Sequence, residues 1–401
     1  MASRAHLLLL GLGSCILTAL HLFRPAPLQA TVLRSGAAQS DLAAATGDAE
    51  HRHACFSRAS DYDGPLQGDW RDVGGGSGLH YAEVMGDRAA LRRGDVNTEA
   101  AERWAARACV LEDAMHSCYY HGEPHASTIS ARDFASSHCR LERFDAARLL
   151  QSLPDTDVYF FGDSIMRQLW QSVGCHASRY IVTAEVFWVK APFQGKGNCP
   201  FKNATHCYSF GPDCVVFGHN GSSTKMCYMM SHPDIPLDDW MGNARHFRLS
   251  PTSSEVVLFN GGLHFPKTEP SMYRDFLQKV AHGANAVRSG GGRFVWMETT
   301  PQHFPTEDGS YNKTARGGRC RPIEKLRPSW TNEIAVPYMR QLGFDVLYTF
   351  DNAWSQWDSH VGATYRNDQL YESGDCSHFC LPGVPDLWSR ILYNMVTAAP
   401  Q

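Results

Sequence analysis

The chain has 401 residues, of which 43% are hydrophobic and 19% charged, a composition typical of a globular protein with a sizeable core. The formal net charge is only −4 and basic residues form no tract, so nothing in the sequence indicates a nucleic-acid partner. We therefore expect a folded protein whose partners are uncharged or bind through only a few charged groups.

The N-terminal segment differs from the rest of the chain. Residues 6–23 form an apolar run between Arg4 and Arg24. A span of about 17 to 25 apolar residues is the length of a transmembrane helix. A secretory signal cleaved near residues 28–30 is the alternative. We favour an uncleaved signal-anchor over residues 1–24, because no clear run of small residues follows it. Either choice sends the rest of the chain into the secretory lumen.

The cysteines and glycosylation motifs agree with that compartment. The chain has 13 cysteines, and setting aside Cys15 in the apolar run leaves an even number, enough for up to six disulfides. No paired Cys-x-x-Cys spacing occurs, so we expect no metal site. Three Asn-x-Ser/Thr motifs, at Asn203, Asn220 and Asn312, predict a glycoprotein.

Three regions follow the anchor. Residues 25–54 are rich in Ala, Ser and Pro and are predicted to form a flexible stem. Residues 55–150 contain cysteines, a glycine run at 74–78 and a helical stretch near 99–113, and we interpret them as a disulfide-tied flanking region. Residues 151–401 form the predicted catalytic domain.

The catalytic domain alternates strand and helix patterns. Apolar strands are predicted at 158–161, 180–188, 214–218, 255–260, 293–300 and 344–350, and helices after residue 164 and near 271–288, 331–342 and 385–396. Nearly continuous apolar strands alternating with helices favour a parallel sheet covered on both faces. Ligands of such sheets bind at the carboxyl ends of the strands. Ser164, Asn260 and residues 299–303 each follow a predicted strand at that edge.

The segment FFGDSIMRQLW (160–170) changes from strand-forming to helix-forming residues at Gly162, Asp163 and Ser164. Ser and Asp are ordinary N-cap residues, because their side-chain oxygens accept the free N–H groups of a helix start. The same position suits a nucleophile, since backbone N–H groups and the helix dipole favour an oxyanion there. The segment alone leaves both possibilities open for Ser164, and Asp163 is expected to hold the turn.

A serine nucleophile needs a base, and the base needs an orienting acid. The segment DCSHFCLPGVPDLW (375–388) places Asp375 three residues before His378, close enough for one turn to bring carboxylate and imidazole together. Cys376 and Cys380 lie on either side of that pair, and in an oxidising lumen we expect them to be disulfide partners rather than nucleophiles.

These two segments together resemble the trichome-birefringence-like or PC-esterase family of the SGNH (GDSL) esterase superfamily. The segments VVLFNGGLHF (256–265) and WMETTPQHF (296–304), and the GGRC that ends at Cys320, are similar to further parts of the family. The match is collinear from Cys55 to Val396. It implies a three-layer α/β/α, flavodoxin-like fold and a Golgi polysaccharide O-acetyltransferase, and it adds Cys320 to the disulfide candidates.

When the family's motifs are matched to this sequence, the resemblance implies that Ser164 is the nucleophile that accepts the acyl group. It implies that His378 is the base and Asp375 the orienting acid. It makes Asn260 an oxyanion-hole residue alongside the backbone N–H of Ser164. It also puts two further residues near the substrate, Arg167 and His303.

The chain departs from the family pattern after Asn260. His264 is displaced by one position relative to the family's histidine, which leaves the substrate contacts there open. Residues 190–250 match poorly, and the second oxyanion glycine, Gly218 or Gly221, is not decided.

The resemblance predicts an O-acetyltransferase that moves an acetyl group to glycan hydroxyls through an acetyl-serine. The partners expected are a glycan acceptor, an acetyl donor and, through residues 6–23, the Golgi membrane. No tightly bound cofactor is expected, and the donor is acetyl-CoA or another acetyl carrier. An SGNH-type carbohydrate acetylesterase, with water as the acceptor, is the alternative. A non-catalytic glycan-binding protein is a third class, which would have no need of Ser164, Asp375 and His378 together.

Overall fold

The computed structural model describes residues 52–57, 64–73, 116, 118, 125–185, 213–231, 233, 237, 240–312, 319–324, 329–361, 365–366, 369–370 and 374–398. The chain divides into two compact units, residues 1–48 and 49–401, and every described residue belongs to the second. The predicted anchor over residues 6–23 and the predicted helix near 99–113 lie outside the described residues. Among the helices within them, none combines the length and the apolar character needed to cross a bilayer.

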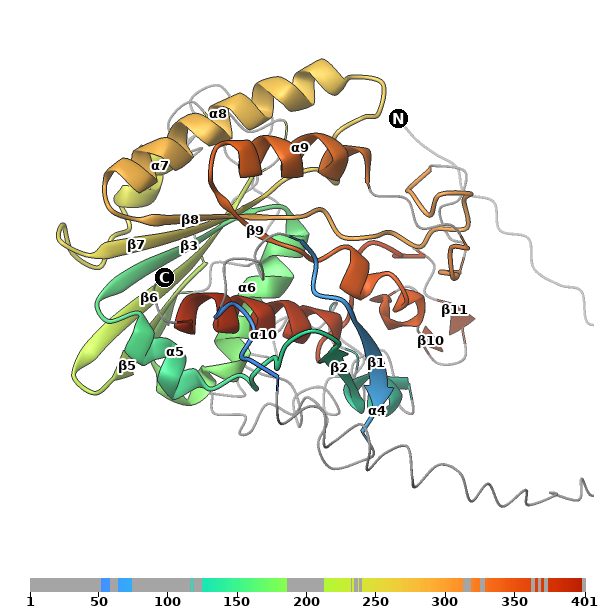
Figure 1. Cartoon of the computed structure of the whole chain (residues 1–401), viewed down its shortest axis with the longest axis horizontal. Helices are drawn as coiled ribbons and strands as arrows, with labels where there is room; N and C mark the ends of the chain where they lie inside the picture. Colours follow the sequence, from blue (N-terminus) through green and yellow to red (C-terminus); the bar gives the residue numbers. More distant parts are fainter. Residues whose placement is uncertain are drawn as a thin grey trace, which may run out of the picture. The chain divides into compact units, whose positions relative to one another are not determined.

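A seven-stranded sheet is the centre of the fold (Figure 1). Across the sheet its strands are β4 (Ile181–Glu185), β5 (Asp213–His219), β6 (Ser222–Met230), β3 (Thr156–Gly162), β7 (Ser254–Asn260), β8 (Arg293–Met297) and β9 (Asp345–Leu347). The five strands from β6 to β9 are parallel, as predicted. Strand β5 runs antiparallel to both of its neighbours, so the sheet is mixed at this edge.

Six helices cover the two faces of the sheet. Helices α5 (Ala146–Ser152), α6 (Ser164–His176) and α10 (Val384–Thr397) pack on one face, and α7 (Trp240–Arg245), α8 (Pro270–Ser289) and α9 (Trp330–Gln341) on the other. Successive side chains of a strand point to opposite faces. Accordingly, Val158 and Phe160 of β3 join the first core and Tyr159 and Phe161 the second. The predicted three-layer α/β/α class is confirmed.

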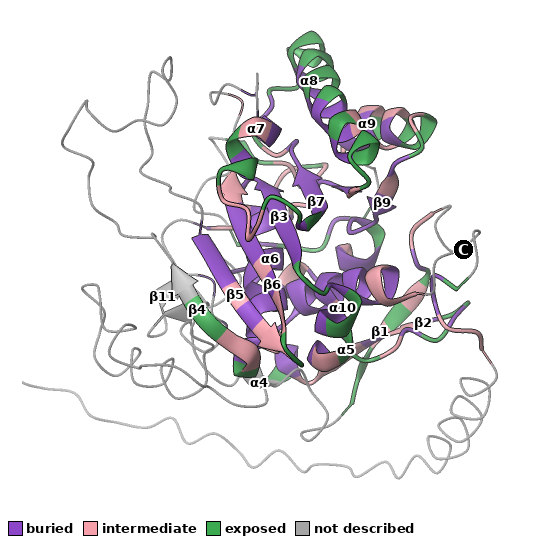
Figure 2. Cartoon of the chain, turned by 90° about the vertical axis from the view of Figure 1, so that its left-hand side faces the viewer, coloured by how far each residue is buried: buried purple, intermediate pink, exposed green. Residues whose placement is uncertain are grey.

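Burial follows from this arrangement (Figure 2). The central strands are buried along their length, while the outward-facing sides of α8 and α9 are exposed. This explains why β3, β7 and β8 each contain a continuous run of four apolar residues, since both faces of each strand lie against a helix layer.

Three elements of the sheet and its helices were not predicted from the sequence: β6, α5 and α7. Strand β6 begins with four polar residues, Ser222 to Lys225, and only then becomes apolar, unlike the strands that were predicted from apolar runs. It is joined to β5 by a tight turn in which Asn220 and Gly221 both have positive φ, 49° and 83°. Such Asn-Gly pairs favour the two-residue hairpin turns that match the twist of a sheet.

The order of the parallel strands creates the place for a site. From β3, the chain continues to β6 on one side and then to β7 on the other. Connections that leave to opposite sides of a strand open a crevice at its carboxyl end, where ligands of doubly wound sheets bind. Ser164 and Asn260 lie at this point, one immediately after β3 and the other at the end of β7.

The flanking region packs beside α10 and contributes a small antiparallel sheet of β1 (Gly68–Asp72) and β2 (Arg132–Ser136), with α4 (His125–Ser130) before β2. A disulfide between Cys55 and Cys139 closes it. Arg390 of α10 donates hydrogen bonds to Asp133 and to the carbonyl of Leu141, which join the region to the catalytic domain. The remaining short elements are η4 (Ser178–Tyr180), η6 (Asp351–Ala353), η7 (Trp357–Ser359), β10 (Tyr365–Arg366) and β11 (Gln369–Leu370).

Candidate active site

The turn from β3 into α6 shows whether Asp163 or Ser164 caps the helix. Asp163 is the N-cap, and its carboxylate accepts a hydrogen bond from the Ile165 N–H at 3.0 Å. Ser164 is therefore the first residue of the helix rather than its cap. A Cβ on Gly162 would lie 2.7 Å from the Cβ of Met166 and 3.0 Å from the carbonyl oxygen of Asn260. Only glycine lets β3 pass that close to β7 before the turn.

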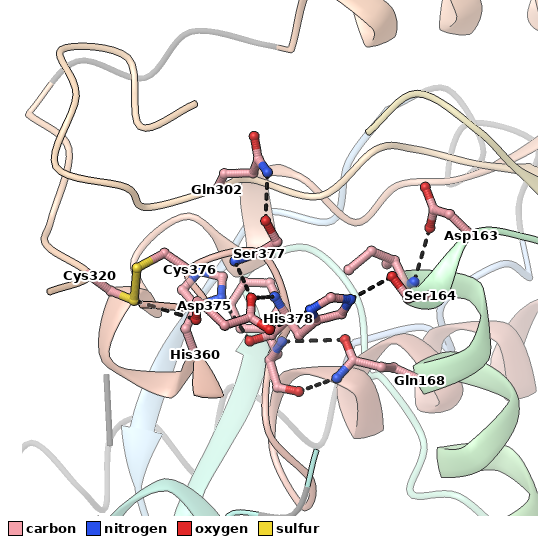
Figure 3. A network of polar contacts seen from close by, with 12 residues as sticks. Asp163, Ser164, Gln168, Gln302, Cys320, His360, Asp375, Cys376, Ser377 and His378 are labelled. Carbon is pink, nitrogen blue, oxygen red and sulfur yellow. Dashed lines mark hydrogen bonds and ion pairs between the residues drawn. A yellow bond between two sulfur atoms is a disulfide. The ribbon is translucent and has the colours of Figure 1, made fainter. Parts of the chain in front are cut away.

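Ser164, His378 and Asp375 form a continuous chain of hydrogen bonds (Figure 3). The Nε2 atom of His378 lies 2.5 Å from Ser164 Oγ, and its Nδ1 atom lies 2.6 Å from Asp375 Oδ2. A carboxylate only accepts at neutral pH, so Nδ1 carries the proton and Nε2 is free to accept the proton of the serine hydroxyl. These are the contacts of a Ser-His-Asp triad.

The local charge favours an ionised Asp375. Burial acts to raise the pKa of its carboxyl, but the His378 charge and hydrogen bond, with the backbone N–H groups of His378 and Ser377, hold the pKa below its ordinary range. Both N–H groups donate to Oδ1 at 3.0 Å. The carboxylate therefore stays charged at neutral pH, as the orienting acid of a triad must.

Residues 374–383, the triad loop, are tied to helix α6 by Gln168. Its Oε1 atom accepts from the Phe379 N–H at 3.3 Å, and its Nε2 atom donates to the Phe379 carbonyl. Gln168 lies four residues after Ser164 and is fully buried, so both side chains come from the same face of the helix. One amide thus fixes the loop relative to the serine. Sequence reasoning missed this residue, because its partner Phe379 lies 211 residues further along the chain.

A pair of buried histidines supports the other side of the loop. His360 Nδ1 lies 3.1 Å from the His378 carbonyl oxygen, and His360 Nε2 lies 2.7 Å from His303 Nδ1. His303 Nε2 lies 2.7 Å from the carbonyl of Trp354. Burial lowers the pKa of His303 to about 4 and that of His360 well below its usual range. The sequence-based analysis did not single out His360.

The two residues predicted to lie near the substrate are both buried. His303 lies fully buried beneath the triad loop. Arg167 is 5% exposed, with its guanidinium 3.8 Å from the Asp213 carboxylate, also buried. In this structure both side chains contribute contacts that support the site.

Disulfides fix the triad loop at two points. Cys376 is bonded to Cys320, and Cys380 to Cys118 of the flanking region. All nine cysteines that the structure describes are disulfide-bonded. Asp375 and His378 therefore lie in a segment that is linked covalently to two distant parts of the chain.

Replacing Cys320 and Cys376 together by serine is expected to lower the free energy of unfolding by about 2 to 5 kcal/mol and to lower kcat of the molecules that remain folded. The loss of kcat follows because the loop that carries Asp375 and His378 gains freedom. A matched control is the double replacement of Cys214 and Cys227, which bridge β5 and β6 away from the triad. Urea unfolding and initial rates check both variants. Equal kcat in the two double variants would contradict a role for the disulfide in shaping the site.

Asn260, the predicted oxyanion-hole residue, is the last residue of β7. Its side chain is 1% exposed, and Nδ2 donates to the carbonyl of Glu298 at 3.3 Å. One of the two Nδ2 hydrogens serves that bond, which leaves the second for an oxyanion.

The two candidate glycines do not lie near Ser164. Gly218 pairs with Ser223, and Gly221 occupies the hairpin turn between β5 and β6. Because β5 is antiparallel, both glycines lie at the amino end of the parallel strands, opposite the site. The neighbour of Ser164 on that side is instead Ser231, directly after β6, whose N–H donates to the Gly162 carbonyl at 2.8 Å.

The displaced histidine, His264, lines a small hollow beside the β3–α6 turn. The hollow is bounded by Asp163, Ser231, Gly262 and Phe265, among others. The side-chain oxygens of Asp163 (Oδ2) and Ser231 (Oγ) are buried and have no hydrogen-bond partner among the described residues. His264 is thus close to the site, on the α8 side of the sheet edge.

Glu298, at the end of β8, is a buried carboxyl beside the site. Burial raises its pKa to about 7, even though the N–H groups of Thr349 and Phe350 donate to Oε2 and act in the opposite direction. A group whose pKa is raised by folding contributes stability that is complete below its unfolded pKa. That contribution is lost as pH rises through the folded value.

The chain is therefore expected to lose on the order of 2 to 3 kcal/mol of stability between about pH 4.5 and pH 8 through Glu298. Glu298→Gln keeps an acceptor oxygen but does not titrate, so it should match the unaltered chain at pH 4.5 and exceed its stability at pH 8. Urea unfolding at both values tests this, with the exposed Glu333→Gln as the control. A Gln variant with no gain at pH 8 would contradict the assignment.

Comparisons with known proteins agree with this geometry. Residues 243–395 match the model of the PC-Esterase family, described as a GDSL/SGNH-like acyl-esterase family found in Pmr5 and Cas1p. Over these residues the chain is similar to the PC-esterase family. The matched residues include Asn260, Asp375 and His378, while Ser164 precedes them.

Curated plant proteins extend the PC-esterase match towards the N-terminus. The chain is 25% identical over 331 residues to protein trichome birefringence-like 9 of Arabidopsis thaliana, covering 71% of this chain and 76% of that protein. It is 24% identical to protein trichome birefringence of the same plant (71% and 52%) and to xylan O-acetyltransferase 6 of Oryza sativa subsp. japonica (65% and 54%). The chain thus spans between about half and three quarters of the length of these relatives.

Proposed function

We propose that this protein is an O-acetyltransferase that moves an acetyl group to hydroxyls of a glycan through an acetyl-serine at Ser164. The observation that carries the proposal is the chain of contacts from Ser164 Oγ through His378 to Asp375, at 2.5 and 2.6 Å. The name of the rice relative, xylan O-acetyltransferase 6, supports a polysaccharide as the class of acceptor.

In the first half-reaction, Ser164 Oγ attacks the acetyl carbonyl carbon while His378 Nε2 takes the hydroxyl proton. The bond to the donor's leaving group then breaks, and His378 returns the proton to that group. The Ser164 N–H and the second Nδ2 hydrogen of Asn260 would receive the negative charge on the carbonyl oxygen. Asp375 holds the proton on Nδ1 and stabilises the imidazolium.

In the second half-reaction, His378 takes the proton of a sugar hydroxyl, whose oxygen attacks the acetyl-serine and releases Ser164. A Ser-His-Asp triad performs transfer and hydrolysis equally, and the outcome depends on whether the acceptor site excludes water. An acetylesterase is therefore the second candidate, and the acyl-esterase description of the matching family favours it.

We further propose that the protein acts in the Golgi lumen as a single-pass type II membrane protein anchored by residues 6–23. The apolar run and the bonded state of the nine described cysteines support this, since disulfides persist in oxidising compartments. Asn220 and Asn312 are exposed, as glycosylated asparagines must be, while Asn203 lies outside the described residues. Protease protection in intact membranes and a mobility shift after deglycosylation would test the topology.

The deciding experiment incubates the full chain with isotope-labelled acetyl-CoA, or with labelled acetyl esters, and a panel of glycans. We expect labelled acetyl on a glycan and, in the absence of acceptor, a labelled acetyl group on the peptide that contains Ser164. Release of labelled acetate without a glycan product would favour the esterase. Glycan labelling that leaves Ser164 unmodified under every condition would overturn the acetyl-serine route.

A further inference from the structure

We infer that His116, from the flanking region, is a positioning residue that holds the face of the His378 imidazole. The inference rests on the proposed function, because it concerns the same triad. Its basis is a ring contact outside the line of hydrogen bonds from Asp375 to Ser164.

The contact joins two rings that are far apart in sequence. The imidazoles of His116 and His378 are stacked, with ring centroids 5.0 Å apart and an interplanar angle of 28°. His116 is only 8% exposed, so the contact is shielded from water. Aromatic rings at this separation attract each other beyond the area that they bury.

The backbone fixes His116 against the triad loop. The N–H of Leu381 donates to the His116 carbonyl at 2.7 Å, and the N–H of Cys118 donates to the Leu381 carbonyl at 2.8 Å. The disulfide between Cys118 and Cys380 closes the same connection covalently. The backbone at His116 is therefore held by the loop that carries the imidazole on which its ring stacks.

A ring contact supplies what the two hydrogen bonds of His378 lack. Asp375 and Ser164 hold two atoms on opposite edges of the imidazole, Nδ1 and Nε2. These contacts in the plane of the ring oppose a tilt only through the angles of the two hydrogen bonds, and the χ2 angle of a histidine is by itself only broadly restrained. A neighbour on the face of the ring removes that tilt. A small misorientation of a reacting group lowers the rate of reaction strongly. Loss of the His116 ring should therefore slow the chemical step.

The charged groups near His116 and His378 give a second measurable effect, on the pH dependence of the reaction. Asp375 faces His378 on its own loop, and His360 lies beneath that loop with His303 behind it. A proton on His116 would oppose the imidazolium that forms on His378, because like charges in contact disfavour each other. Phenylalanine at position 116 keeps a ring on the face and carries no charge.

The test compares His116→Ala and His116→Phe in the full chain, with the exposed His282→Ala of α8 as the control. The readout is the rate at which a fluorophosphonate probe labels Ser164. In that reaction the serine oxygen forms a bond to phosphorus, fluoride leaves, and the serine proton passes to His378. We expect His116→Ala to label about three- to tenfold more slowly, and His116→Phe to retain nearly the full rate near neutral pH. Thermal unfolding should match that of the control.

The pH profile and substrate turnover complete the test. Wherever His116 takes up a proton, the acidic limb of the labelling profile should lie at higher pH in His116→Phe, because the opposing charge is gone. His116→Ala labelling at the unaltered rate, or His116→Phe labelling as slowly as His116→Ala, would overturn the inference. A chain that labels at Ser164 but transfers acetyl to no glycan and releases no acetate would overturn the proposed function alone.

Discussion

Ser164→Ala is expected to abolish acyl transfer while the chain stays folded. The alanine removes the atom that forms the covalent bond, and loss of a triad member costs roughly 10⁴ to 10⁶ in turnover. The fold should tolerate the change, because Asp163 rather than Ser164 caps α6, and its carboxylate keeps the hydrogen bond from the Ile165 N–H. Initial rates of acetyl transfer, together with thermal unfolding, measure the two effects separately.

A second serine serves as the control for Ser164. Ser152, at the end of α5, is exposed and bonds only to the Arg148 carbonyl of its own helix, 2.9 Å away. Ser152→Ala should keep full activity. If Ser164→Ala retained more than a small fraction of the activity of Ser152→Ala, the nucleophile would have to lie elsewhere.

Asp375→Asn is expected to lower kcat by about 10⁴ while the affinity for the acceptor glycan changes little. An amide can occupy the same space and keep accepting from the N–H groups of Ser377 and His378 through one oxygen. It carries no charge for the imidazolium, however, and its NH₂ group facing Nδ1 would select the wrong tautomer of His378. The substitution should therefore lower kcat rather than the affinity for the glycan.

The comparison for Asp375→Asn is Asp351→Asn. Asp351 begins η6 and is exposed, and the same chemical change there leaves the triad intact. Acetyl transfer and glycan binding should be measured for both variants. Equal losses of transfer, or a loss of affinity alone in Asp375→Asn, would show that Asp375 is not the acid of the triad.

The central part of the fold was predictable because it obeys simple periodicities. Strands β3, β7 and β8 each contain a continuous run of four apolar residues, and α8, which follows β7, has one buried stripe, so the strand–helix alternation stands out in the sequence. Strand β6 was missed because its first four residues are polar, which leaves it without the apolar start of the other strands. Without β6, the direction of β5 in the sheet could not be predicted. It was therefore not possible to tell that Gly218 and Gly221 lie at the end of the sheet away from Ser164.

The triad could be proposed from sequence because its members lie in two short motifs. Their supports could not, since each joins segments that only the fold brings together. Gln168 reaches the Phe379 backbone from 211 residues away, and His360 contacts the His378 carbonyl from another loop. His116 depends on a disulfide partner whose identity cysteine spacing does not reveal. Residue type alone could not separate His303, a buried support, from a residue that meets substrate.

The disulfide between Cys118 and Cys380 also affects when the active site can form during synthesis and folding. It spans 262 residues, so its second sulfur is synthesised long after its first. His378 lies two residues before Cys380, and α10, which packs against α6, follows a few residues later. The nascent chain can therefore acquire its β3–α6 turn and its serine early but cannot assemble the triad until Asp375 and His378 have been made. Competence for acyl chemistry then marks a chain that has been synthesised past Cys380 and oxidised, and reductant present during synthesis should yield protein in which Ser164 is intact but reacts more slowly.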